Sequence, residues 1–182
     1  MKLAIVAYPS LDDTDRQWIE AFRARHDPQS PRIDVHFTLV FPVEAQPNDL
    51  EPGIVAATNS LPPISFAIRS TKVVRDVLGD MSHVFLVPDE GSGEITTLHD
   101  RLYAGVLRRH LRTDIPFVPH MTVGAAADFA TAEKVAEGLS VHSRIVRGTV
   151  LSIELVNVGT RHVQAIAAYT LGNAAATPRW GQ

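Results

Sequence analysis

The sequence predicts a mixed fold of the α+β class, in which strands and helices alternate along a chain of 182 residues. Short apolar runs with period-two alternation predict strands, and longer segments with apolar residues three or four positions apart predict helices. The expected order is βαβαββαβαββ, with strand and helix alternating in each half of the chain. The length is sufficient for one domain with a sizeable core.

The first half of the chain is expected to contain two helices among four strands. An apolar run closed by Pro9 predicts the first strand, and Ser10 with Asp13 resembles a capping box for the helix that follows. Pro42 closes the second strand, and the pair Gly79-Asp80 suits the turn of a hairpin. The expected strands are Lys2–Tyr8, Val35–Phe41, Ile64–Arg75 and Ser82–Val87, and the expected helices are Leu11–His26 and Asn48–Ser60.

The second half begins with a long expected helix, Ser92–Arg112. Its apolar stripe at helical spacing consists of Ile95, Leu98, Leu102 and Val106. Three arginines, Arg108, Arg109 and Arg112, are expected in its last turn, where the helix dipole favours cations. Strands at His120–Ala125, Arg144–Val158 and His162–Leu171, with a helix at Ala132–Leu139, complete the pattern. Residues 1–172 are expected to form one domain, and residues 173–182, with Trp180, a mobile tail.

Composition limits the classes of function. The formal net charge is −3, which argues against a protein that coats DNA or RNA through a broad basic surface. There are no cysteines, so disulfides, thiolate catalysis and cysteine-bound zinc are excluded. No segment is apolar enough to span a membrane, and no signal peptide is evident. We therefore expect a cytoplasmic protein, acting as a monomer.

The pattern His-x-Thr followed by an aliphatic residue occurs twice, 84 residues apart. The copies are His36-Phe37-Thr38-Leu39 and His120-Met121-Thr122-Val123, each on an expected strand. Side chains at positions i and i+2 of a strand share one face, roughly 6.5–7 Å apart. Each histidine is therefore expected beside its threonine, with the residue between them facing the core.

Two such pairs suit phosphodiester chemistry. In-line attack at phosphorus needs a base on the attacking oxygen and an acid on the leaving oxygen, which lie on opposite sides of phosphorus. Histidine suits both roles because its ordinary pKa of roughly 6.5 is close to the working pH. A hydroxyl beside each histidine can donate to the charged non-bridging oxygens. We therefore expect His36 and His120 as acid and base, and Thr38 and Thr122 as phosphate anchors.

With their flanking residues Phe41-Pro42 and Phe117-Val118-Pro119, the two motifs resemble those of the 2H phosphoesterase superfamily, in its 2'-5' RNA ligase and cyclic phosphodiesterase branch. The resemblance covers nearly all of residues 1–172. It implies a bilobal fold with two pseudo-symmetric β-sheet lobes, flanking helices and a central cleft, one motif from each lobe. It also implies metal-independent opening of a 2',3'-cyclic phosphate to a 2'-phosphate, on an RNA end or a small nucleotide, without a cofactor.

Three alternatives remain open on the sequence alone. The same site could perform 2'-5' ligation, or cleave a specialised nucleotide metabolite. A third possibility is a non-catalytic module that binds RNA ends or nucleotides, although binding alone does not require two titratable groups. No acidic residue accompanies either motif, and no two histidines show His-x-x-x-His spacing, so no metal site is expected.

Several other residues are weighed as substrate-binding candidates. Arg69, Thr71 and Arg75 share a strand face, and Arg69 or Thr71 would hold a second phosphate or a base if that face lines the cleft. A base could stack on Phe117 or on another aromatic residue near the motifs, namely Tyr8, Phe41 or Phe85. His83 is interpreted as a strand-edge residue. The remaining histidines, His26, His99, His110, His142 and His162, are expected at the surface.

Overall fold

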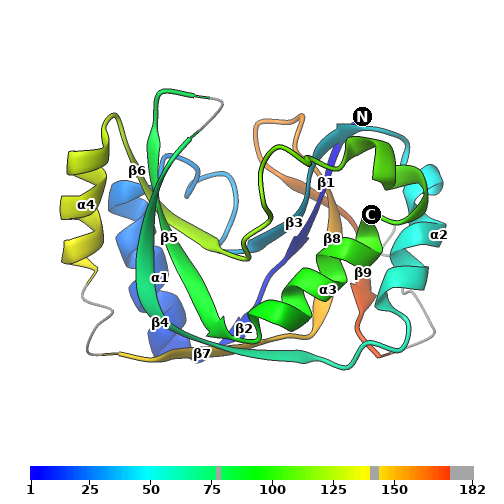
Figure 1. The fold of residues 1–182 in the computed structure, drawn as a ribbon, viewed down its shortest axis with the longest axis horizontal. Helices are drawn as coiled ribbons and strands as arrows, with labels where there is room; N and C mark the ends of the chain where they lie inside the picture. Colours follow the sequence, from blue (N-terminus) through cyan, green and yellow to red (C-terminus); the bar gives the residue numbers. More distant parts are fainter. Residues whose placement is uncertain (77–78, 140–143, 173–182) are drawn as a thin grey trace.

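The computed structural model describes residues 1–76, 79–139 and 144–172, and it confirms the α+β fold (Figure 1). Its strands form one curled antiparallel sheet in the order β2-β7-β4-β5-β6-β3-β1-β8-β9. The strands are β1 (Lys2–Ala7), β2 (Ser10–Leu11), β3 (Phe37–Glu44), β4 (Ile64–Arg75), β5 (Ser82–Glu90), β6 (Met121–Ala126), β7 (Val146–Val150), β8 (Ser152–Asn157) and β9 (Gln164–Thr170). The helices are α1 (Asp13–His26), α2 (Pro47–Thr58), α3 (Ser92–Leu102) and α4 (Phe129–Gly138), with the 3-10 helix η1 (Gly105–His110).

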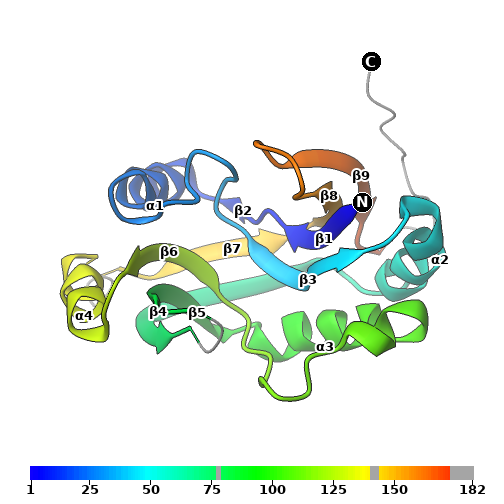
Figure 2. The ribbon, with the colours of Figure 1, turned by 90° about the horizontal axis from the view of Figure 1, so that it is seen from above.

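The sheet has two lobes. The first lobe contains β2, β7, β4, β5 and β6, and the second contains β3, β1, β8 and β9. Helices α1 and α4 pack on the first lobe, whereas α2 and α3 lie toward the second (Figures 1 and 2). The lobes meet where β3 and β6 run side by side, at the single register pair Phe37–Met121. The expected bilobal arrangement is therefore confirmed, and the two motifs lie at its junction.

One face of the central strands forms the core. Phe37 and Leu39 of β3, and Met121 and Val123 of β6, are at most 1% exposed. The motif histidines and threonines, which stand at alternate positions, are only half-buried. Alternation along each strand therefore holds the middle residue of each motif in the core and turns the polar residues to the opposite face.

The first helix begins differently from the expectation. Ser10 and Leu11 form the short strand β2, which pairs with β7 rather than starting the helix. The N-cap is Asp12, whose carboxylate accepts a hydrogen bond from the Thr14 backbone N–H at 2.9 Å. The predicted capping box is wrong because pairing with a distant strand takes up Ser10 before the helix begins.

Contrary to the prediction, Pro42 does not end its strand, since β3 continues to Glu44. The register between β1 and β3 shifts between the pairs Leu3–Val43 and Ile5–Val40, so Pro42 lies in an irregular stretch of the ladder. Proline is accepted in such bulges and at strand edges because no ladder hydrogen bond is required from it there.

The helix expected over Ser92–Arg112 ends at Leu102. Gly105 has a φ of +66°, and the 3-10 helix η1 starts there in a new direction. Val106 is consequently 51% exposed instead of joining the apolar stripe, and Leu107 is buried in its place. The three arginines follow this break, so they do not lie in the last turn of α3.

The segment expected as one strand, Arg144–Val158, forms two strands that belong to different lobes. β7 pairs with β4, whereas β8 pairs with β1. The chain crosses between lobes at Leu151, which is 47% exposed. The buried positions change from even-numbered (Val146 and Val150) to odd-numbered (Ile153 and Leu155) at this crossing, so the alternation shifts by one residue there.

The region expected as a tail, residues 173–182, lies outside the described residues, as does His142. Among the helices that the structure describes, none combines the length and the apolar character needed to cross a membrane.

Gly91, the N-cap of α3, should not tolerate a side chain. Its φ is +79°, and a Cβ there would collide with the Ser65 carbonyl oxygen and with Phe66. We expect Gly91→Ala to lower the free energy of unfolding by about 2–3 kcal/mol. Gly93→Ala is the matched control, because nothing lies within 4 Å of its Cβ position and alanine favours the helix. Urea unfolding of both variants checks this, and equal stability would contradict it.

Candidate active site

The four polar motif residues gather on one face of the sheet at the lobe junction. β3 and β6 are antiparallel with Phe37 opposite Met121. Continued by one residue in each direction, this register places His36 opposite Thr122 and Thr38 opposite His120. Directly opposite residues have Cβ atoms roughly 4.5–5.5 Å apart. Each histidine therefore has one threonine beside it on its own strand and another across the junction.

Both imidazole rings are oriented by the same backbone contact. Nδ1 of His36 lies 2.7 Å from the Asp34 carbonyl oxygen, and Nδ1 of His120 lies 2.6 Å from the Val118 carbonyl oxygen. A carbonyl oxygen only accepts, so Nδ1 carries the hydrogen and donates it in each ring. The atom that gains or loses a proton is therefore Nε2 in both histidines. The two motifs thus present equivalent proton-transfer atoms.

A buried ionic cluster secures the segment that leads to His36. Arg23, 1% exposed, donates to Asp27 at 2.8 Å and to the Ile33 carbonyl oxygen at 2.9 Å. It also donates to Glu20 at 3.0 Å, and the Glu20 carboxylate accepts from the Val35 backbone N–H at 2.6 Å. These bonds fix the backbone on both sides of Asp34, whose carbonyl orients His36.

The two rings differ in their packing. Phe85 of β5 stacks on His120 with ring centroids 3.8 Å apart and planes inclined by 22°. His83 continues this row, nearly parallel to Phe85 at 6.0 Å. His36 instead meets the edge of Tyr8 at 6.1 Å. The His120 ring is consequently held on one face by an aromatic ring, whereas His36 has only an edge contact.

The pKa of each motif histidine is lowered, so both favour the neutral form. Burial is the main cause for His120, whose pKa falls to about 4, and His36 and His83 lower it further. Burial is also the main cause of the lowered pKa of His36, with a further contribution from the Arg23 cation. The carbonyl bonds oppose these shifts in both rings but do not cancel them. Neutral imidazoles can accept a proton, and a bound anion would favour protonation of one of them.

The motif threonines are available to a ligand. Thr38 and Thr122 are half-buried. Within residues 1–76, 79–139 and 144–172, neither hydroxyl has a hydrogen-bond partner from the protein. Two hydroxyl donors and two Nε2 atoms therefore share one face, which is the donor set that a phosphodiester requires.

The structure gives the substrate-binding candidates Arg69 and Thr71 other contacts. Arg69 is held by ion pairs with Asp89 and Glu90. Thr71 pairs in register with the buried Leu86, whereas the neighbouring Lys72 pairs with Phe85. A register irregularity between Ile68 and Ser70 displaces the alternation, so the even-numbered positions of β4 from Ser70 onward share the histidine face. Nothing in the sequence pattern indicated this shift.

The prediction for one histidine is wrong. His99 is not at the surface but 4% exposed, and its ring stacks on Phe117 at 3.7 Å. Phe117 therefore packs against a buried side chain of α3. His83 is the second residue of β5, so it lies near the end of its strand, as expected, although β5 itself is an inner strand between β4 and β6. The buried Arg23 was not anticipated, since a charged residue on an amphipathic helix is ordinarily exposed.

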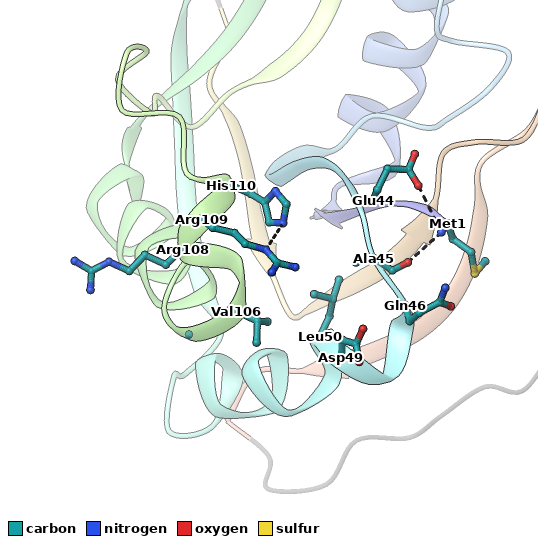
Figure 3. Close-up of a pocket in the computed structure, with 11 residues that line it drawn as sticks. Met1, Glu44, Ala45, Gln46, Asp49, Leu50, Val106, Arg108, Arg109 and His110 are labelled. Atoms are coloured by element: carbon teal, nitrogen blue, oxygen red, sulfur yellow. Dashed lines mark hydrogen bonds and ion pairs between the residues drawn. The ribbon is translucent and has the colours of Figure 1, made fainter.

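A separate groove of about 960 Å³ lies at the far end of β3, and none of the four motif residues lines it (Figure 3). Arg109 and His110 of η1, joined by a hydrogen bond of 3.1 Å, face the groove from one side. Glu44 and Asp49 line the other side. Because its walls carry opposite charges, the groove lacks the uniform positive potential that a polyanion would require.

The two-lobed sheet with one His-x-Thr motif on each side of its junction places the protein in the class of 2H phosphoesterases. More particularly, a family model described as the 2'-5' RNA ligase superfamily matches residues 11–161. The chain belongs to this superfamily.

Individual relatives agree. A provisionally named phosphoesterase from Bacillus licheniformis is 30% identical over 127 residues, covering 68% of this chain and 70% of that protein. One from Bacillus cereus is 30% identical over 129 residues, covering 68% and 69%. Among solved structures, one titled as a phosphoesterase has a TM-score of 0.62 at 16% identity, covering 94% of this chain and 99% of the other. E. coli LigT has a TM-score of 0.55 at 16% identity, covering 94% and 98%. At such identities the structures establish the fold alone.

Proposed function

We propose that this protein is a two-histidine phosphodiesterase that opens a 2',3'-cyclic phosphate, on an RNA end or a nucleotide, to a 2'-phosphate. The observation that carries the proposal is the pair of equivalent Nε2 atoms at the lobe junction, each beside a threonine hydroxyl. E. coli LigT, which has a similar fold, was crystallised with 3'-AMP, with ATP and with phosphate, which supports a nucleotide as the ligand.

The proposed reaction proceeds in one displacement at phosphorus. One neutral histidine takes a proton from water at Nε2, and the water oxygen bonds to phosphorus. The bond from phosphorus to the 3' oxygen breaks, and the other histidine, protonated at Nε2, supplies a proton to that oxygen. Thr38 and Thr122 donate hydrogen bonds to the non-bridging oxygens, whose charge persists through the transition state. Both histidines belong to one chain, so a monomer suffices.

The direct test is hydrolysis of uridine 2',3'-cyclic phosphate in excess chelator, with the product identified as the 2'- or 3'-phosphate. We expect turnover that the chelator does not reduce, and the 2'-phosphate as product. Activity that is lost with chelator and restored by a divalent metal would contradict the mechanism. Tight binding without turnover would instead indicate a binding module.

The pH dependence of kcat/KM should be bell-shaped with its maximum below pH 6.5. One histidine must be neutral and the other protonated, and both pKa values lie below the ordinary 6.5, that of His120 near 4. Rising pH removes the proton from the acid, so the rate falls toward neutrality and above. Falling pH protonates the base, so the rate also falls toward pH 4. Initial rates between pH 4 and 9 check this, and a maximum above pH 8 would contradict it.

A further inference from the structure

We propose that Lys72 binds a second phosphate of the substrate, the one on the 5' oxygen of the nucleoside whose 2',3'-cyclic phosphate reacts. This inference rests on the proposed function and specifies its substrate class as nucleotides with a 5'-phosphate group. It arises from the position of Lys72 on the face that carries the motif residues.

The sheet register places Lys72 in one row with the second motif. Thr122 of β6 pairs with Phe85 of β5, and Phe85 pairs with Lys72 of β4. Residues paired in this way lie on the same face of a sheet. Two strand spacings of about 4.8 Å separate the backbones of Thr122 and Lys72. The flexible four-carbon stem of lysine can extend the ammonium group over much of this distance.

Lys72 is a cation free to bind a ligand. It is exposed, and among residues 1–76, 79–139 and 144–172 no carboxylate forms an ion pair with it. The nearby Arg69 is, by contrast, neutralised by two carboxylates. On β4 and β5, the other residues on the same face as Lys72 and Phe85 are Ser70, Val74, His83 and Val87. None of these four is a lysine or an arginine. An anionic group that extends from the reacting phosphate over this lobe therefore meets one unpaired positive charge.

The corresponding position in the second lobe has the opposite charge. Thr38 pairs with Val6, and Val6 pairs with Glu154 of β8, so Glu154 is placed relative to Thr38 as Lys72 is to Thr122. Tyr8, whose ring contacts that of His36, is within the electrostatic influence of this carboxylate: its pKa is raised to about 12 by burial first and by Glu154 second. The Glu154 carboxylate repels a second phosphate in the second lobe, whereas the Lys72 ammonium group attracts it in the first lobe. The charge difference thus breaks the pseudo-symmetry of the site and directs the 5'-phosphate toward Lys72.

Two sources could supply such a phosphate: the phosphodiester linkage of an oligoribonucleotide end, or a terminal 5'-monophosphate. Three substrates separate these sources. They are uridine 2',3'-cyclic phosphate, the same compound with a 5'-phosphate, and the dinucleotide in which adenosine is joined to that phosphate. The first lacks the group that Lys72 would bind, and the second and third carry it in two forms.

The experiment compares kcat/KM for these substrates in the wild type, Lys72→Gln and Lys72→Arg, with Lys134→Gln as the control. Lys134 is an exposed lysine of α4, outside the row. We expect Lys72→Gln to lower kcat/KM about tenfold for the two 5'-phosphorylated substrates, mainly through KM, and less than twofold for the first substrate. Lys72→Arg should retain most of the activity, and Lys134→Gln all of it. Added salt should weaken the 5'-phosphate preference of the wild type.

An equal loss on all three substrates, or no loss on any, would overturn the inference. A loss confined to the dinucleotide would assign Lys72 to a chain linkage, and a loss confined to the monophosphate would assign it to a terminal phosphate. If the wild type hydrolyses none of the three, the proposed function fails. The role of Lys72 is then tested by binding: the affinity for uridine 2',5'-bisphosphate is compared with the affinity for uridine 2'-phosphate. Equal preference for the bisphosphate in the wild type and Lys72→Gln would contradict the inference.

Discussion

Replacing either motif histidine by asparagine should lower kcat on the order of 10²–10⁴-fold without unfolding the protein. The asparagine amide N–H occupies roughly the position of Nδ1 and can still donate to the carbonyl that orients the ring, from Asp34 or from Val118. Only the proton-transfer atom Nε2 is lost. His36→Asn and His120→Asn therefore separate chemistry from stability, with turnover and thermal unfolding as the two measurements.

The double variant should be little slower than either single variant, because the acid and the base act in one step. His162→Asn is the matched control, since His162 is exposed in the loop between β8 and β9. Its activity should equal that of the wild type. Full activity in both single motif variants would overturn the two-histidine mechanism.

The second large effect concerns Arg23. We expect Arg23→Met to lower the free energy of unfolding by about 3–5 kcal/mol, because it leaves the carboxylate of Asp27 buried without its cation. The loss of the Arg23 cation should also raise the pKa of His36, which this cation lowers. Urea unfolding measures the first effect, and an NMR titration of the His36 ring measures the second.

Two comparisons make this prediction specific. Arg25→Met, at an exposed position of the same helix, should cost less than about 0.5 kcal/mol. The double variant Arg23→Met with Asp27→Asn should recover part of the lost stability, because the unpaired charge is then removed. A double variant less stable than Arg23→Met would show that the ion pair is not the source of the effect.

The shared face of each histidine and its threonine could be predicted from the sequence. His36 and Thr38, and likewise His120 and Thr122, are close in sequence, and strand alternation is a local property that needs no tertiary information. The apolar residue within each motif indicated which face would be buried. The identity of the substrate, and the roles of the four residues in catalysis, stay predictions.

Three of the failures share a physical cause, because each depends on a contact distant in sequence. The pairing of β2 with β7 removed Ser10 from the first helix, and the crossing at Leu151 follows from two different partner strands. Likewise, the irregularity near Ser70 turned Lys72 rather than Thr71 toward the histidine face. Local propensity carries no information about such pairings.

The order of strands in the sheet has a consequence for synthesis of the protein. The second lobe joins β1, from the start of the chain, to β8 and β9, from its end, while β2 continues directly from β1 into the other lobe. The second lobe therefore cannot be completed on the ribosome until the last strands have emerged, and β1 must wait with one edge unpaired. Such long-range closure favours slow, concerted folding. The sheet around β3 would therefore be completed last, after both motif strands have been synthesised.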